Sequence, residues 1–135
     1  IAWNGQYFMA VGDGLTSYYS ATGNSWTYGG SSPTAGQASA GSVIGRPGFF
    51  CAGMISNGAN LGGIWRTTDL GANWTHVDAY SGRLYSAAKN ETYLILGSGG
   101  GGSTVGKYSI DNGLTWTEIV PALIDTAITC NYFGD

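Results

Sequence analysis

One short motif recurs along this chain at intervals that restrict what it can fold into. Its third copy, residues 109–117, reads SIDNGLTWT, and its second copy, residues 67–75, reads TTDLGANWT. A worn copy at residues 20–27, SATGNSWT, is one residue shorter and lacks the Asp. The motif tryptophans lie 48 and then 42 residues apart: Trp26, Trp74 and Trp116. A period of that size fits a repeated unit of four short strands.

A second repeated feature precedes each copy of the motif. Three apolar runs, at residues 7–10, 49–52 and 93–96, begin 42 and then 44 residues apart. The chain also contains 24 Gly but only 3 Pro, and 13% of its 135 residues are aromatic. Such a composition is typical of many short strands joined by tight turns, and no segment shows a helical period. We therefore predict an all-β protein.

The residues of the motif can be explained by the needs of a tight turn, without any catalytic role. The Asp side chain can accept hydrogen bonds from backbone N–H groups in the turn that follows a strand. The Gly allows a backbone conformation that other residues resist, and the Trp can pack its ring against the sheet. We therefore expect a self-capped turn built by Ser20, Gly23, Trp26, Thr67, Asp69, Gly71, Trp74, Ser109, Asp111, Gly113 and Trp116.

The pattern Ser/Thr-x-Asp-x-Gly-x-x-Trp resembles the Asp-box, or BNR repeat, of sialidases and many other β-propellers. The resemblance implies four antiparallel strands in each unit, with the box between the third and fourth strands. Residues 7–27 are also loosely similar to repeats of phage and bacterial surface proteins, which implies an extracellular, virion or cell-surface setting. Nearly the whole chain is covered by these likenesses.

On this template the chain divides into three blades, at about residues 1–37, 38–80 and 81–122. The first strands of the three blades are expected at residues 1–4, 38–44 and 83–89, and the second strands at 6–12, 48–54 and 92–97. The third strands are expected at 16–20, 63–67 and 106–110, and the fourth strands at 25–28, 73–78 and 115–120. Residues 123–135 are an extra strand that either closes a ring or pairs with a second chain.

Three blades are too few to close a ring, because closed propellers typically have 4–8 blades. Two chains give six blades under a twofold axis, the commonest oligomer symmetry. We therefore predict a homodimer that forms one six-bladed ring. The alternative is that the chain is a fragment of a longer array.

Charge and residue counts argue against several classes of function. With 5 Lys+Arg against 8 Asp+Glu, the chain has no basic patch for nucleic acid. One His and two Cys do not make a usual zinc site, so no metal or other cofactor is expected. We expect Cys51 and Cys130 to be buried thiols, and the alternative is one disulfide bridge between them. No apolar stretch approaches the ~20 residues that span a membrane, so insertion is not expected.

Catalysis of the sialidase type is the less favoured hypothesis. That family uses an arginine cluster, a Tyr–Glu nucleophile pair and an acid Asp, and its Arg usually lies in an Arg-Ile-Pro motif. Here Arg46 is followed directly by Pro47, so we expect it to be a turn residue. Asp69 and Asp111 are assigned to the box turns. The other acids form no recognisable constellation: Asp13, Asp78, Glu91, Glu118, Asp125 and Asp135. Of these, we expect Asp78 and Glu118 to be solvated charges at the ends of the fourth strands.

Aromatic side chains give the best indication of binding. Tyr19, Trp65 and Tyr108 lie just before each box and suit stacking on a sugar, with Arg46 and Arg66 as further candidate ligand residues. The alternative is that these aromatics pack between blades. Three functions stay open: a non-catalytic recognition or scaffold module for a glycan or surface partner, a sialidase-type hydrolase, and a structural fragment without a ligand. Fold alone does not choose among them.

Overall fold

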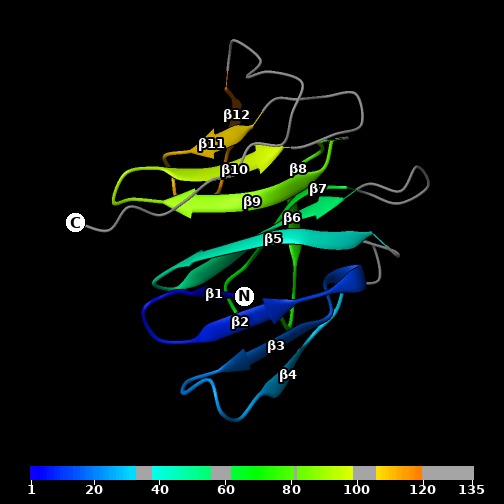
Figure 1. The fold of residues 1–135 in the computed structure, drawn as a ribbon, viewed down its shortest axis with the longest axis vertical. Helices are drawn as coiled ribbons and strands as arrows, with labels where there is room; N and C mark the ends of the chain where they lie inside the picture. The colour runs from blue at the N-terminus through cyan, green and yellow to red at the C-terminus, as the bar shows by residue number, and fades with distance from the viewer. Residues whose placement is uncertain (33–37, 56–61, 81, 99–105, 120–135) are drawn as a thin grey trace.

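The computed structural model describes residues 1–32, 38–55, 62–80, 82–98 and 106–119. These residues form three four-stranded antiparallel sheets, each built from four consecutive strands (Figure 1). The all-β prediction is confirmed, and the number of strands in each repeat is as expected. No α-helix occurs in the described ranges, and none of their helical segments is long and apolar enough to cross a membrane.

The strands follow the repeats closely. Sheet 1 contains β1 (Ala2–Trp3), β2 (Phe8–Val11), β3 (Ser17–Ser20) and β4 (Thr27–Gly30), with a 3-10 turn, η1 (Asp13–Leu15), before β3. Sheet 2 contains β5 (Ser39–Arg46), β6 (Phe49–Ile55), β7 (Gly63–Thr67) and β8 (Thr75–Asp78). Sheet 3 contains β9 (Leu84–Lys89), β10 (Leu94–Ser98), β11 (Lys107–Ser109) and β12 (Thr117–Glu118). Each box lies between the third and fourth strands of its sheet.

The fourth strands begin two residues later than the sequence predicts, at Thr27, Thr75 and Thr117. In sheets 2 and 3 the cause is the box itself. The N–H groups of Asn73 and Thr115 donate to the carboxylates of Asp69 and Asp111 at 2.9 Å in each case. A donor used within the turn is not available to the strand ladder, so pairing starts only beyond it.

The first strands of the three sheets lie side by side. Strand β5 contacts both β1 and β9, and Figure 1 shows β9, β5 and β1 in the middle of the molecule, with β12 and β4 at its opposite ends. The three first strands therefore lie together, while the fourth strands of sheets 1 and 3 lie at the two ends of the molecule. This arrangement brings together residues that are more than 40 positions apart in the sequence.

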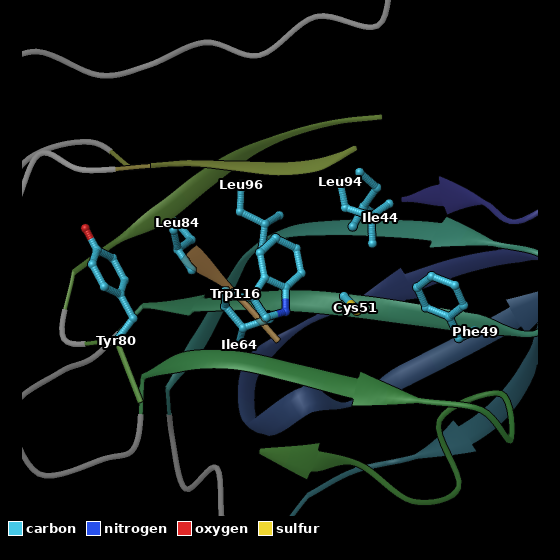
Figure 2. Packing of buried hydrophobic residues seen from close by; sticks show 9 residues of the cluster. All are labelled: Ile44, Phe49, Cys51, Ile64, Tyr80, Leu84, Leu94, Leu96 and Trp116. Carbon is cyan, nitrogen blue, oxygen red and sulfur yellow. The ribbon is translucent and has the colours of Figure 1, made fainter. Parts of the chain in front are cut away.

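Two apolar layers separate the three sheets. Between sheets 1 and 2, Met9 packs against Val43 and Phe50, while Leu15 of η1 packs among side chains of sheet 2. Between sheets 2 and 3 lies the cluster drawn in Figure 2, made of Ile44, Phe49, Cys51, Ile64, Tyr80, Leu84, Leu94, Leu96 and Trp116. Because successive side chains on a strand point to opposite faces, sheet 2 contributes one face to each layer.

Two sequence predictions fall outside the described residues: the extra strand expected at residues 123–135 and the thiol expected at Cys130.

Candidate functional site

An open groove of about 490 Å³ is lined by the first strands of all three sheets. Its walls are residues 1–5 of sheet 1, residues 43–45 and Pro47 of sheet 2, and residues 87–89 of sheet 3. Most of these residues are apolar or glycine. The groove exists only where three repeats meet, so it is a property of the assembly of sheets and not of any single motif.

Lys89 brings a positive charge to this groove. Its amine donates to the carbonyl oxygen of Trp3 at 2.9 Å and to that of Gly45. The strand register gives Trp3, Gly45 and Lys89 the same place in the three sheets, opposite Phe8, Phe50 and Leu94 respectively. One side chain of the third repeat therefore bonds to the backbone of the same position in the other two.

The surroundings disfavour the charge on this amine. Partial burial is the larger cause and the positive charge of Arg46 is the second, and together they lower the pKa of Lys89. Desolvation and a like charge both act against a protonated amine, whereas a nearby negative charge acts in its favour. An anion bound in the groove would therefore be stabilised by Lys89 and would raise its pKa again.

Arg46 is the last residue of β5 and pairs with Phe49, so it flanks the Pro47–Gly48 turn and is not itself the turn residue that the sequence predicts. Its guanidinium reaches sheet 3, where it donates to the carbonyl oxygens of Asn90 and Tyr93, the latter at 3.1 Å. A longer contact of 3.4 Å joins it to the side-chain oxygen of Asn112. Arg46 thus ties sheet 2 to a turn and a box of sheet 3.

Arg66 has a similar bridging role. Its Nε donates to the carbonyl oxygen of Asn112 at 3.0 Å, and its guanidinium lies 4.6 Å from the centre of the Phe49 ring. A cation over an aromatic face is attracted by the ring quadrupole. The two arginines singled out as ligand residues therefore meet at the box of sheet 3, where they hold two sheets together.

Among the residues that the structure describes, no acid forms an ion pair with the amine that Lys89 brings to the groove. Within the described ranges, the ion pairs are those of Lys107 with Asp78 at 3.2 Å and with Glu118 at 3.6 Å. Lys89 and Arg46 form none there, although the chain as a whole has a net charge of -3. The groove is thus a local cationic site on an acidic protein.

Tyr19, Trp65 and Tyr108 all lie just before a box, but they do not occupy one recurring position. Tyr19 and Tyr108 are one residue before the box hydroxyl, whereas Trp65 is two residues before it, and the strand pairing matches Arg66 to the two tyrosines. A shift of one residue moves a side chain to the opposite face of a sheet. Trp65 is accordingly buried, at 2% exposure, and stacks on His76.

The other two aromatics are half-buried and pair with tyrosines of their own sheet. Tyr19 makes an edge contact with Tyr7 at 5.8 Å, and Tyr108 makes one with Tyr93 at 6.0 Å between ring centres. For Trp65 the structure favours packing over ligand stacking. For Tyr19 and Tyr108, sugar stacking stays a prediction.

Each box turn has a hydroxyl side chain at the same position. Ser20, Thr67 and Ser109 each accept hydrogen bonds from two backbone N–H groups of the turn, including that of the box glycine at 2.8, 3.0 and 2.9 Å. In the worn box the Thr22 hydroxyl accepts from Asn24 at 3.3 Å, in the place where the other boxes use Asp. The hydroxyl is therefore an acceptor that all three turns use, whereas the Asp is present in only two of them.

The two box carboxylates are held in the ionised form. For Asp111, hydrogen bonds from the side chain and backbone of Thr115 lower the pKa to about 2 against a small opposing effect of burial. For Asp69, burial acts to raise the pKa, but hydrogen bonds from Asn73 and Thr67 outweigh it and the pKa is lowered. Both carboxylates are committed to their turns.

Asp78 and Glu118 were expected to be solvated charges at strand ends. For Asp78 this is wrong, because its side chain is only 16% exposed and pairs with the buried Lys107. Glu118, at 53% exposure, approaches the same amine from the outside. Lys107 and Asp78 come from sheets 3 and 2, so the pair joins neighbouring sheets.

Two further residues have structural surroundings. His76 is half-buried, and its Nε2 lies 3.0 Å from the carbonyl oxygen of Gly62. Cys51 is a buried free thiol whose pKa is raised to about 12, chiefly by burial. In the part of the chain that the structure describes, no cluster of three or more His, Cys, Asp or Glu side chains could hold a metal ion.

Comparison with known proteins does not assign this chain to a family. No family model matches it, and no curated protein matches it. The groove and its charges are therefore the main guide to what the protein binds.

Lys89 was not predicted as a site residue from the sequence. A signal was present, because Lys89 is the one charged residue in the segment 84–89.

Proposed function

We propose that this chain is a β-propeller-type recognition module that binds an anionic ligand, without catalysis, in the groove between its first strands. Support for the propeller arrangement comes from the sheets, which stack through apolar layers while their first strands lie together. In that architecture the first strands surround the central axis. The groove of about 490 Å³ would then lie on the axis.

The observation that carries the proposal is the uncompensated positive charge of Lys89. Its amine is partly desolvated, bonded only to neutral carbonyl oxygens among the described residues, and close to a second cation. Hydrogen bonds to an ionised group are about twice as strong as neutral ones. A carboxylate or other anionic group in the groove would supply the missing charge.

The walls of the groove indicate the body of the ligand. Apolar side chains and glycines dominate, and Trp3 is partly exposed at 41%. Aromatic and apolar surfaces suit the less polar face of a sugar ring, so acidic glycans are the ligand class that fits both the charge and the walls. Extracellular, virion or cell surfaces are where such glycans would be met.

Catalysis has little support in the described carboxylates. Asp69 and Asp111 are bonded within the box turns, Asp78 is paired with Lys107, and none of these lines the groove. Glycoside hydrolysis commonly needs two carboxyl groups flanking one bond. Release of a chromogenic group from a sialoside by the purified protein would nevertheless restore the hydrolase alternative.

A glycan array with matched acidic and neutral members tests the proposal, using wild type, Lys89→Met and Arg83→Met. Arg83 is an exposed cation outside the groove, so its variant controls for the loss of one charge. We expect acidic glycans to bind, Lys89→Met to weaken binding by roughly 10- to 100-fold, as for loss of a charge-assisted hydrogen bond, and Arg83→Met to change it little. Equal binding by wild type and Lys89→Met would refute a groove site.

A further inference from the structure

The three sheets pack in one direction, with a different face on each side. We call the face that contains Met9, Cys51 or Ile95 the leading face, and the face that contains Phe8, Phe50 or Leu94 the trailing face; the strand register places the members of each set at the same position. Met9 of sheet 1 packs on Phe50 of sheet 2. Cys51 of sheet 2 lies in one cluster with Leu94 of sheet 3. Both contacts join a leading face to the next trailing face.

Polar contacts follow the same direction. Arg66, on the leading face of sheet 2, donates to Asn112 of sheet 3. Asp78, also on the leading side of sheet 2, pairs with Lys107 on the trailing face of sheet 3. The stacking is therefore head-to-tail at both contacts. Among the described residues, no neighbouring sheet packs on the trailing face of sheet 1 or on the leading face of sheet 3.

Burial at matching positions shows that the trailing face of sheet 1 is uncovered. Trp65 and Lys107, two residues before their box hydroxyls, are 2% and 8% exposed, but Tyr18 at the same position of sheet 1 is 44% exposed. Phe50 and Leu94 are buried, whereas Phe8 is only half-buried. Trp3, Tyr18 and Tyr28 thus form an aromatic surface, with Tyr18 and Tyr28 in edge contact at 5.5 Å.

The leading face of sheet 3 is uncovered in the same way. Met9 and Cys51 have no exposed surface, but Ile95 at the same position is half-buried. Its neighbours on that face are Ala88, Tyr108 and Thr117. The strand residues of this face carry no charge, and neither do those of the trailing face of sheet 1. Two apolar faces with the geometry of a repeated contact are therefore open.

We propose that these two faces bind each other between two copies of this chain: the trailing face of sheet 1 of one copy packs on the leading face of sheet 3 of the other. The inference rests on the propeller architecture proposed above. The contact would continue the one that already joins sheets 1, 2 and 3, so Phe8 would meet Ile95 of the partner subunit as Phe50 meets Met9. Head-to-tail contacts close into a ring when the rotation allows, and six is the only multiple of three within the usual 4–8 blades.

The test is the solution mass of the full chain by light scattering, for wild type and three variants. Tyr18→Arg and Ile95→Arg each place a charge in one of the two faces. Thr68→Arg is the matched control, because Thr68 is exposed in the box turn of sheet 2, both of whose faces are already covered. Circular dichroism and thermal unfolding confirm that each variant is folded.

We expect wild type and Thr68→Arg to have the mass of two chains, and Tyr18→Arg and Ile95→Arg to have the mass of one. Mixing Tyr18→Arg with Ile95→Arg should restore a two-chain species. In that mixed dimer the unmodified trailing face of the Ile95→Arg chain packs on the unmodified leading face of the Tyr18→Arg chain, so one of the two contacts is intact. A wild-type mass of one chain, or an open-ended series of larger species, would overturn the two-copy ring. Dimers that only one of the two face variants disrupts would overturn the head-to-tail contact.

The outcome is independent of ligand binding. A two-chain species that ignores acidic glycans would leave the interface standing and remove the proposed function. A protein that has the mass of one chain and binds acidic glycans through Lys89 would support the proposed function and rule out the interface.

Discussion

Gly113 of the third box lies directly against Cys51 of the neighbouring sheet. A Cβ at position 113 would come within 2.4 Å of the Cys51 sulfur, and the glycine has φ of +77°. Two separate requirements therefore demand glycine here: a left-handed backbone, and space for the thiol beneath. The box turn is thus a sheet–sheet contact as well as a local cap.

Replacing Gly113 by Ala should destabilise the protein through both effects. A left-handed conformation costs an L-residue roughly 1–2 kcal/mol, and overpacking of a core costs typically 1–3 kcal/mol. We expect a loss of about 2–5 kcal/mol in the free energy of unfolding, measured by urea denaturation. Gly48→Ala is the control, because φ is +87° there but no atom lies within 4 Å of the added Cβ.

The comparison separates strain from packing. Gly48→Ala should lose only the roughly 1–2 kcal/mol of backbone strain, and Cys51→Ala should lessen the additional cost of Gly113→Ala. Equal losses at positions 48 and 113 would show that the contact with the thiol contributes nothing.

Lys107 should be much more sensitive to one of its two carboxylate partners than to the other. Asp78→Ala removes the half-buried partner and leaves a buried ammonium, which for buried pairs costs about 3–5 kcal/mol. Glu118→Ala removes a 53% exposed partner, and exposed pairs are worth ~0.2–1 kcal/mol. Chemical denaturation of the two variants measures the difference, and similar losses would contradict the assignment of Asp78 as the main partner.

Much of the fold could be predicted from sequence, because the repeat fixes it locally. Each box signals a turn by its own residues, and its spacing implies the strands on either side. Sequence spacing was less reliable for the face that a side chain occupies, as Trp65 shows, since an error of one residue reverses the assignment. The late start of the fourth strands also escaped prediction, because it depends on which acceptor takes the N–H groups of Asn73 and Thr115.

The groove could not be predicted from any one repeat. Lys89 bonds to residues 86 and 44 positions away in the sequence, and such contacts arise only when the sheets stack. The same is true of Lys107 and Asp78. A lone lysine at the end of a strand usually indicates a solvated charge, and only the relative placement of three sheets makes Lys89 the charge of a shared groove.

The box hydroxyls should matter as much in the worn box as in the complete ones. Ser20 is 3% exposed and accepts from the N–H groups of Thr22 and Gly23. Ser20→Ala leaves these donors without that acceptor, and an unsatisfied buried group costs ~1–3 kcal/mol. We expect Ser20→Ala and Ser109→Ala to lose similar amounts of unfolding free energy. A negligible loss at Ser20 would mean that the worn turn is held mainly by other contacts.

Acid should weaken the complete boxes over a defined range of pH. The pKa of Asp111 is about 2 in the folded chain against an ordinary value of 3.8. Because the folded-state value is depressed, its contribution to stability is present above about pH 4 and is lost as the pH falls toward 2. Asp69 acts in the same direction. Asp111→Asn removes one titrating group while keeping one side-chain acceptor oxygen, so it should be less stable than wild type at pH 7 and lose less stability between pH 4 and pH 2. Urea midpoints at a series of pH values measure this, and parallel pH profiles for the two proteins would show that Asp111 does not titrate with folding.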